Sequence, residues 1–222
     1  LLSGGLDSSL ITAISKEYKN NLNTYSIGFE TINSEEGNEF HYSDMVANDL
    51  KTLHEKYSVT SFDLLNSLDD VIMSMSEPMF SQDSSAFYLL AKNVSKSAKV
   101  VLSGQGADEV FGGYFWYEKI MREKELNGID TLLKYYFDRS YDNYKTTIHS
   151  DYISENYASN DIESRLKHMD PSLSILDKVF RLELSMFIID DPVKRVDNMT
   201  MSHSLEARVP FLDIDLISFM LS

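Results

Sequence analysis

The chain has 222 residues, 43% of them hydrophobic, so it can bury a full core as one domain or as a domain with a helical extension. Its formal net charge of -15 argues against a nucleic-acid-binding surface, because no basic stripe is available to displace counterions. Zero cysteines exclude disulfides, thiolate zinc sites and cysteine nucleophiles, and no apolar run approaches the roughly 20 residues of a membrane span.

The chain opens on Leu-Leu-Ser-Gly-Gly-Leu-Asp-Ser-Ser, an apolar strand end that runs into a glycine turn and then a helix. The free N–H groups of such a turn and the positive end of the helix dipole favour an anion. Gly4 and Gly5 let the backbone come close to that anion. Three hydroxyl donors flank the turn: Ser3, Ser8 and Ser9. The motif therefore predicts a phosphate site.

Asp7 adds a carboxylate to this motif, which repels phosphates unless a cation such as Mg²⁺ lies between them. No Gly-Lys-Ser/Thr follows, so the motif is not a P-loop. Together these features suggest magnesium pyrophosphate. The alternative is a tight strand-to-helix turn at Gly4 and Gly5, in which Asp7 only complements the helix dipole.

The next segments alternate between helical and strand patterns, which predicts a doubly wound parallel sheet. Leu10, Ile11, Ile14 and Tyr18 keep helical spacing after the first motif. The further elements expected in order are a strand at 24–29, an acidic loop at 30–40, a helix at 42–53 with Tyr42, Met45, Val46, Leu50 and Leu53 on one face, a strand at 57–60, a helix at 64–75, a break at Glu77-Pro78, a helix at 85–97 and a strand at 100–102.

The strand at 100–102 runs into a second Ser-Gly turn, Ser103-Gly-Gln-Gly-Ala-Asp108, so the chain makes the same strand-to-turn transition twice. In an open parallel sheet, ligands bind outside the carboxyl ends of the strands. Asp7 and Asp108 are therefore expected at one crevice, where two carboxylates facing one triphosphate would form a metal clamp.

Residues 114–187 read as aromatic-rich helices, with an interruption near Pro171. We expect an α/β core over residues 1–118, followed by a helical lobe and substrate-side segment over 119–222. Only two residues precede the first turn, so we expect the start of the first strand to be missing. The chain ends in the apolar stretch 216–221, so we expect a fragment that is truncated at its C-terminus as well. The absence of a signal peptide favours the cytoplasm.

The segment 190–213 holds a group of cations that is rare in this acidic chain: Lys194, Arg195 and Arg208. A crevice that binds ATP and a carboxylate needs such cations. Arg208 could instead pair with Glu206 or Asp213 in a structural turn. Met199 and Met201 are expected in the core. The five histidines lack metal-ligand spacing, so surface or core positions are expected for them.

Three motifs in this order, at residues 3–8, 103–114 and 196–213, resemble the synthetase domain of glutamine-hydrolysing asparagine synthetases and the related β-lactam synthetases. The resemblance is weakest between residues 119 and 185. It implies an N-type ATP pyrophosphatase fold, which is adenine nucleotide alpha hydrolase-like. In that family the domain activates a carboxylate as its acyl-adenylate, releases pyrophosphate and lets an amine attack.

The resemblance also implies roles for individual residues. Asp7 and Asp108 are the candidate Mg²⁺ ligands. Ser3, Gly5, Asp7, Ser8 and Ser9 would hold the pyrophosphate, while Leu1, Ile27 and Gly104 would border the adenosine. The candidate catalytic residues are Asp7, Gln105, Asp108 and Arg208. The candidate ATP contacts are Leu1, Ser3, Gly4, Gly5, Asp7, Ser8, Ser9, Ile27, Ser103 and Gly104.

Two residues depart from the family pattern and leave the substrates open. Gln105 stands where asparagine synthetases carry a glutamate, and Asn198 replaces a common cation. We expect aspartate as the carboxylate, ammonia as the nucleophile, and a glutaminase domain on the N-terminal side. The alternatives are another carboxylate and amine pair as in β-lactam synthetases, a pyrophosphatase-type enzyme of the GMP synthetase, NAD synthetase or tRNA-thiolating kind, and a nucleotide-binding scaffold without turnover.

Overall fold

A computed structural model of the chain describes residues 1–30, 38, 40–79, 81, 83–124, 128–137 and 139–221. It contains two compact units. The first, which we call the α/β unit, combines Leu1–Ala107 with Ile188–Ser222, and the second, the helical unit, is Asp108–Phe187. The expected domain boundary at residue 118 stays a prediction. The expected loop at 30–40 lies mostly outside the described residues.

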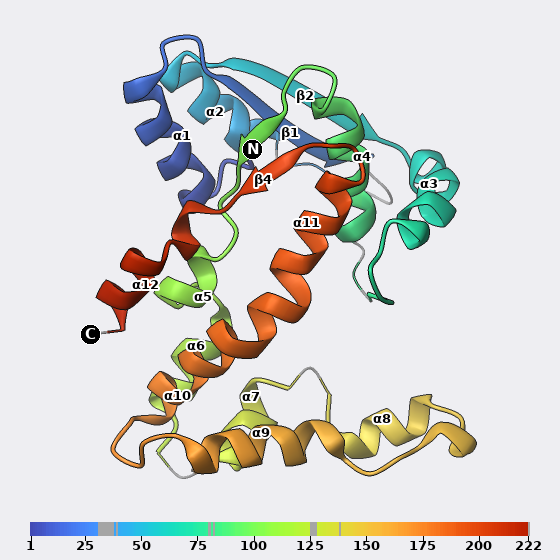
Figure 1. Cartoon of the computed structure of the whole chain (residues 1–222), viewed down its shortest axis with the longest axis vertical. Helices are drawn as coiled ribbons and strands as arrows, with labels where there is room; N and C mark the ends of the chain where they lie inside the picture. The colour runs from blue at the N-terminus through green and yellow to red at the C-terminus, as the bar shows by residue number, and fades with distance from the viewer. Residues whose placement is uncertain are drawn as a thin grey trace. The chain divides into compact units, whose positions relative to one another are not determined.

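The α/β unit alternates strands with helices, as the sequence pattern predicts (Figure 1). Its strands are β1 (Asn23–Phe29), β2 (Leu53–Val59), β3 (Val100–Leu102) and β4 (Glu206–Arg208). Its helices are α1 (Leu6–Tyr18), α2 (Phe40–Leu50), α3 (Ser61–Met73), α4 (Asp83–Val94), α11 (Lys194–Met201) and α12 (Ile214–Met220), with a π-helical turn at Ile189–Val193 and a 3₁₀ turn at Pro210–Leu212.

Both strand pairs are parallel, and Leu1 and Leu2 lie between them. β1 pairs with β2 from Asn23 opposite Leu53 onward, and β3 pairs with β4 from Val100 opposite Glu206 onward. The Leu2 nitrogen donates to the Tyr25 carbonyl at 2.9 Å, and the Leu1 nitrogen donates to the Leu102 carbonyl at 2.6 Å. The first two residues therefore connect the two pairs by main-chain hydrogen bonds.

The two faces of β1 have different chemistry, because successive side chains of a strand point to opposite faces. Tyr25 and Ile27 pack with Leu90 and Val94 of α4 in an apolar cluster. Thr24 and Ser26 point the other way and form hydrogen bonds with side chains next to α2. The helices therefore cover both faces, with α2 on the polar side of β1 and α4 on its apolar side.

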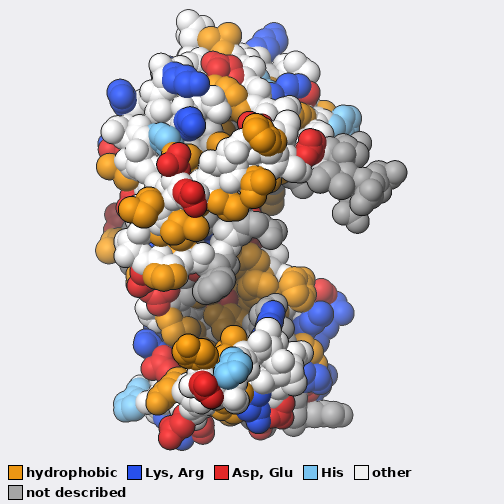
Figure 2. All heavy atoms as spheres, turned by 90° about the vertical axis from the view of Figure 1, so that its right-hand side faces the viewer, with side chains coloured by type: hydrophobic (Ala, Val, Ile, Leu, Met, Phe, Trp, Pro, Cys, Tyr) orange, Lys and Arg blue, Asp and Glu red, His pale blue; other side chains and the backbone are white. Residues whose placement is uncertain are grey.

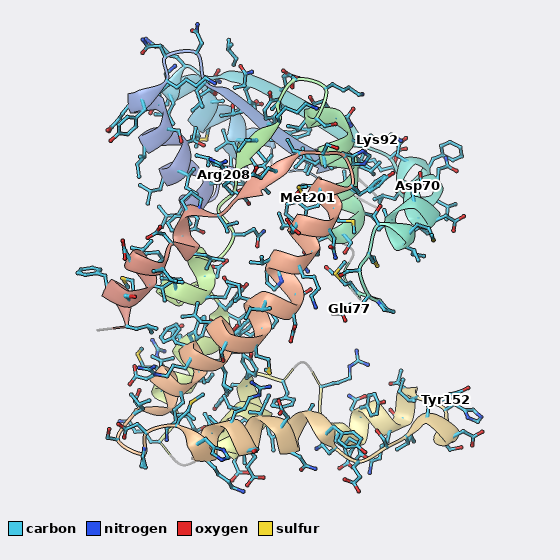
Figure 3. The ribbon with its side chains drawn as sticks, viewed as in Figure 1. Asp70, Glu77, Lys92, Tyr152, Met201 and Arg208 are labelled. Carbon is cyan, nitrogen blue, oxygen red and sulfur yellow. The ribbon has the colours of Figure 1, made fainter. Side chains whose placement is uncertain are left out.

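The core of the α/β unit gathers around α4. Its buried residues Leu90, Ala91 and Val94 pack with Val101 and Leu205, while Tyr88 and Leu89 pack with Val59, Val71 and Met199 in a neighbouring cluster. Met199 is fully buried, as expected. Met201, expected in the core as well, is 51% exposed, because it is the last residue of α11 and the chain turns away there (Figure 3).

The predicted helix over 42–53 is too long, since α2 ends at Leu50 and Leu53 is the first residue of β2. Lys51 adopts a left-handed conformation with φ of 52°, which ends a helix. The apolar helical stripes are also less buried than their spacing suggests. Tyr18 of α1 is 86% exposed, and Figure 2 shows hydrophobic side chains interspersed with charged ones on the surface.

The helical unit contains no strand among its described residues, in agreement with the sequence. Its helices are α5 (Ala107–Phe111, whose first residue belongs to the α/β unit), α6 (Phe115–Arg122), α7 (Ile129–Tyr135), α8 (Tyr141–Thr147), α9 (Tyr157–His168) and α10 (Ile175–Leu182), with a 3₁₀ turn at Ser150–Tyr152 and a π-helical turn at Glu183–Phe187. Pro171 lies between α9 and α10, as expected. Ser174 and Asp177 then form a capping box that starts α10.

The helical unit buries an acid in its core. Glu183 is fully buried next to the buried Glu109, which accepts a hydrogen bond from Tyr114 at 2.7 Å. Neither Glu183 oxygen meets a donor at good geometry within the described part of the chain. Burial raises the pKa of Glu183 to about 7, with a further rise from the Glu109 charge and a partial offset by Tyr117, Trp116 and Tyr136.

The free energy of unfolding should therefore fall as the pH rises. The pKa of Glu183 is near 4.5 in the unfolded state and about 7 in the folded state, so the folded state binds the proton more tightly. The stabilisation that this proton gives is complete below pH 4.5 and is lost as the pH rises through 7. Glu183→Gln should remove this dependence and stabilise the protein above neutral pH by up to about 3 kcal/mol.

Urea unfolding at about pH 5 and about pH 8 measures this effect, since the two conditions bracket the transition. Glu118→Gln is the matched control, because Glu118 is exposed on α6. A Glu183→Gln variant whose stability tracks the wild type at both pH values would contradict the assignment.

Candidate functional site

The first glycine turn is built by its own hydroxyls and by a close contact with α2. Ser3 and Ser8 hydroxyls lie 2.9 Å apart, and the Ser8 hydroxyl accepts from the Ser3 N–H at 3.2 Å. Gly4 has φ of +94°, and a Cβ atom there would lie 2.5 Å from the backbone of Tyr42 and Ser43. Only glycine fits this position, so the turn stays narrow where an anion is expected.

The turn leads directly into α1, which begins at Leu6 with Gly5 as its N-cap. No side chain caps this helix end, which leaves the first N–H groups available to an anion. Asp7 lies half-buried in the first turn of α1. The Ser9 hydroxyl is buried and has no hydrogen-bond partner among the described residues. These features fit a site for phosphate oxygens with a cation beside Asp7.

The two Ser-Gly turns meet at one edge of the sheet. A Cβ atom at Gly104 would lie 3.1 Å from the Ser8 nitrogen and 3.3 Å from the Asp7 Cβ. Ser103 is buried, and its N–H donates to the Arg208 carbonyl at 2.8 Å as an extension of the β3–β4 pairing. The residues predicted to hold ATP at the two turns are thus neighbours within the α/β unit.

Asp108 follows the last residue of the first segment of the α/β unit and is the first residue of the helical unit. Its carbonyl accepts from the N–H groups of Gly112 and Gly113 at 2.8 and 3.0 Å, which closes the short helix α5. Because Asp7 and Asp108 belong to different units, their separation stays a prediction. Gln105 remains in the α/β unit, half-buried, where its N–H donates to the Ser103 hydroxyl at 3.5 Å.

The predicted cations of the third segment all have acidic partners. Arg208 lies on β4 and donates to Glu206 at 2.8 Å, an exposed pair of the kind considered above (Figure 3). Lys194 pairs with Glu77. Arg195 is buried and donates to Asp191 at 3.0 Å, but its Nε has no partner in the described part of the chain.

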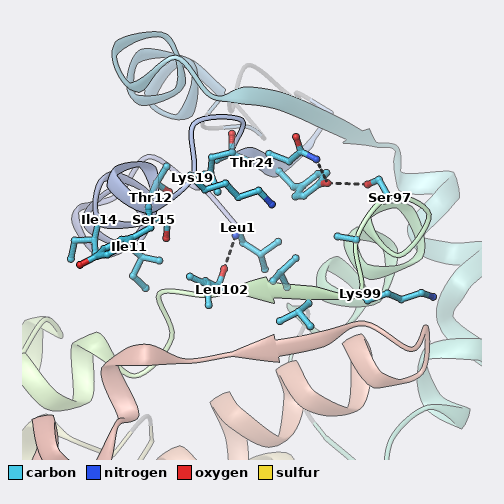
Figure 4. Close-up of a pocket in the computed structure, with 17 residues that line it drawn as sticks. Leu1, Ile11, Thr12, Ile14, Ser15, Lys19, Thr24, Ser97, Lys99 and Leu102 are labelled. Atoms are coloured by element: carbon cyan, nitrogen blue, oxygen red, sulfur yellow. Dashed lines mark hydrogen bonds between the residues drawn. The ribbon is translucent and has the colours of Figure 1, made fainter.

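Leu1 and Ile27, predicted to border adenosine, both pack on the apolar cluster that contains Val101. A separate cavity of about 660 Å³ lies beside Leu1, between the starts of β1 and β3, and α1 lines one side of it (Figure 4). None of the serine residues of the first turn lines this cavity. It is therefore distinct from the predicted phosphate site.

Within the described residues, no group of three or more His, Cys, Asp or Glu side chains could hold a metal ion. A magnesium site at this edge would thus depend on few carboxylates and on phosphate oxygens. Among the residues that the structure describes, no helix is long and apolar enough to cross a membrane.

Sequence reasoning missed a polar cluster behind the first turn, in which His54 lies near Ser26 and Ser43. The available signal was the alternation of Thr24 and Ser26 with apolar residues along β1. His54 lies between the predicted helix over 42–53 and the predicted strand over 57–60, so the sequence pattern assigned it to no face of the sheet.

Comparison with known proteins decides the family. The asparagine synthase family matches residues 1–222, which is the whole chain. The chain belongs to the asparagine synthase family. Its α/β fold with parallel strands is the ATP pyrophosphatase fold of that family, as the resemblance implied.

Two asparagine synthetase relatives from Bacillus subtilis match nearly the full length of the chain. Asparagine synthetase (glutamine-hydrolysing) 1 of Bacillus subtilis strain 168 is 28% identical over 244 residues, covering 96% of this chain and 38% of the relative. The form numbered 3 from the same organism is 30% identical over 99% of this chain and 38% of its own length. Asparagine synthetase B of Escherichia coli K12 is 33% identical over 57% of this chain and 25% of its own length. The chain thus spans about 38% of the Bacillus relatives.

Gly4→Ala tests the geometry of the first turn. The new Cβ would meet the α2 backbone at 2.5 Å in a left-handed conformation, so we expect a loss of about 2 kcal/mol or more in the free energy of unfolding. Gly5→Ala is the matched control, because its Cβ would meet only the Ser3 hydroxyl at 3.5 Å and its φ is -68°. Urea denaturation measures both, and equal losses would rule out the close contact.

Proposed function

We propose that this chain is the ATP-dependent, amide-forming ligase domain of an asparagine synthetase. In this reaction a carboxylate takes the adenylyl group of ATP, pyrophosphate leaves, and ammonia then displaces AMP to form the amide. The observation that carries the proposal is the meeting of the two Ser-Gly turns, where Gly104 lies against Asp7 and Ser8.

The first turn supplies the pyrophosphate site. The uncapped N-terminus of α1 and the serine hydroxyls donate to phosphate oxygens, and the helix dipole favours their negative charge. The narrow contacts at Gly4 and Gly104 allow main-chain groups to reach the phosphates without a side chain in between. These groups bind the leaving pyrophosphate and stabilise the charge that develops on it.

Asp7 and Asp108 are the residues that would hold Mg²⁺, and the uncapped helix end with the unpartnered Ser9 hydroxyl fits the phosphate oxygens that would share the ion. When bound, Mg²⁺ neutralises the phosphate charge that Asp7 would otherwise repel. The protein contributes by placing the carboxylate of the substrate near the α-phosphate, and the reaction needs no protein nucleophile.

The carboxylate substrate is aspartate and the nitrogen source is ammonia released from glutamine, as the names of the relatives suggest. A glutaminase domain would supply that ammonia. Gln105 favours one second candidate, a related enzyme with another carboxylate and amine pair as in β-lactam synthetases. An amide at this position can orient an amine by hydrogen bonds but cannot accept its proton.

Exchange of labelled pyrophosphate into ATP tests the proposal directly. The full-length protein should catalyse exchange that depends on aspartate. Exchange that requires a different carboxylate would replace aspartate with that substrate, and ATP binding without any exchange would indicate a scaffold.

Asp7→Asn and Asp108→Asn should each lower the exchange rate by about 100-fold or more, since each removes a charge worth about 3 kcal/mol in the transition state. Asp63→Asn is the matched control, because Asp63 caps α3 on the exposed surface. A wild-type exchange rate in either variant would show that the replaced aspartate does not hold Mg²⁺ and only caps its helix.

Gln105→Glu should preserve ATP-dependent exchange and change the amine step or its pH dependence, because a carboxylate can take a proton that an amide cannot. Gln105→Ala should slow amide formation by loss of orientation. Amide formation measured across pH with several amines separates these effects. Identical rates and pH profiles in all three proteins would make Gln105 a spectator of the turn.

A further inference from the structure

A cluster of hydroxyl groups surrounds His54 between the polar face of the sheet and α2. We call it the hydroxyl cluster, and it consists of His54, Thr24, Ser26 and Ser43. His54 on β2 pairs directly with Thr24 on β1, so both side chains share one face. The His54 side chain is only 8% exposed, and the three hydroxyl residues are buried.

Two members of the cluster contact the first glycine turn. The Ser26 hydroxyl donates to the carbonyl of Leu2, the residue before Ser3. Ser43 lies in the first turn of α2, and its backbone nitrogen is one of the atoms that a Cβ at Gly4 would meet at 2.5 Å. His54 Nε2 lies 3.3 Å from each of these two hydroxyl oxygens. His54 Nε2 thus lies between Ser26 on β1 and Ser43 on α2, the two residues that contact the turn.

The hydrogen-bond network determines which ring nitrogen carries the proton. The Ser26 hydroxyl proton goes to the Leu2 carbonyl, and the Ser43 hydroxyl proton goes to the Phe40 carbonyl at 3.2 Å. Both oxygens can therefore accept from His54, which favours a proton on Nε2. In a neutral ring Nδ1 is then the acceptor, and it receives the Thr24 hydroxyl at 2.9 Å.

The surroundings favour this neutral ring. Burial lowers the pKa of His54, with smaller opposing effects from Asp44, whose carboxylate lies 4.0 Å from Nε2, and from a hydrogen bond with the Thr24 backbone. Lys56 pairs with that carboxylate at 2.7 Å, which reduces its pull on the ring. The Asp44 carboxylate lies farther from Nε2, at 4.0 Å, than either serine hydroxyl, at 3.3 Å, so the hydroxyls are the nearer acceptors.

We propose that His54 is a positioning residue for the nucleotide turn, in which the N–H at Nε2 joins Ser26 and Ser43 and thereby fixes residues 2–5 between β1 and α2. The binding part of this inference rests on the proposed function, because ATP is the ligand whose pyrophosphate the turn would hold. The structural part, the order of the turn and the tautomer of the ring, does not depend on it.

Two substitutions separate the two ring nitrogens. The side-chain amide of His54→Gln can place a nitrogen where Nε2 lies, which keeps a donor for Ser26 and Ser43. The amide of His54→Asn can reach only the position of Nδ1, so it keeps the contact with Thr24 and loses the other two. Both variants are neutral and polar, which makes each a control for the other.

We expect His54→Asn to raise the KM for ATP about tenfold, with kcat changed less than about threefold, while His54→Gln stays near the wild type in both. Amide hydrogen exchange of residues 2–5 should be about tenfold faster in His54→Asn than in the other two proteins. Imidazole ¹⁵N shifts of the wild type should report a protonated Nε2 and a bare Nδ1.

A proton on Nδ1, or equal behaviour of the Gln and Asn variants in both assays, overturns the proposal. The ¹⁵N measurement needs only the wild type, so it decides the matter even where a variant does not fold. If the wild type neither binds ATP nor exchanges pyrophosphate, the proposed function fails, whereas hydrogen exchange and the tautomer still test His54.

Discussion

Main-chain hydrogen bonds from Leu1 and Leu2 join the two strand pairs, and the site depends on them. Leu2 donates to Tyr25 of β1 and Leu1 donates to Leu102 of β3, so a single extended stretch lies between the two strands. The turn that follows this stretch and the turn that follows β3 meet at one edge of the sheet. This arrangement brings Gly104 against Ser8, although nearly a hundred residues separate them in sequence.

Close backbone contact explains why the two turns need glycine. At Gly4 the left-handed φ and the α2 backbone leave no room for a side chain, and at Gly104 the restriction comes from the first turn of α1. The glycines thus have a packing role and a binding role at once, because the same absence of Cβ that lets the elements meet exposes N–H groups to an anion. The sequence motif alone could not separate these two roles.

Local signals were sufficient for much of the fold. The alternation along β1 and the short apolar run of β3 predicted both strands, and helical spacing predicted α1 and the all-helical character of residues 114–187. Errors arose where tertiary contacts decide. α2 stops early because Lys51 turns left-handed, which no periodicity reveals, and the exposure of Tyr18 depends on what packs against α1. The hydroxyl cluster needed the register of β1 and β2, since only pairing places His54 beside Thr24.

Charge distribution limits how this acidic chain can bind a polyphosphate. Lys194 pairs with Glu77 and Arg208 pairs with Glu206, while the buried Nε of Arg195 has no hydrogen-bond partner among the described residues. Binding that relied on lysine and arginine would have to break these pairs. No ion pair has to break when an anion is bound by main-chain N–H groups, the dipole of α1 and serine hydroxyls. A divalent cation beside Asp7 would outweigh the negative charge of that carboxylate. An anion site built from backbone groups and a metal ion does not depend on basic side chains and is therefore compatible with a net charge of -15.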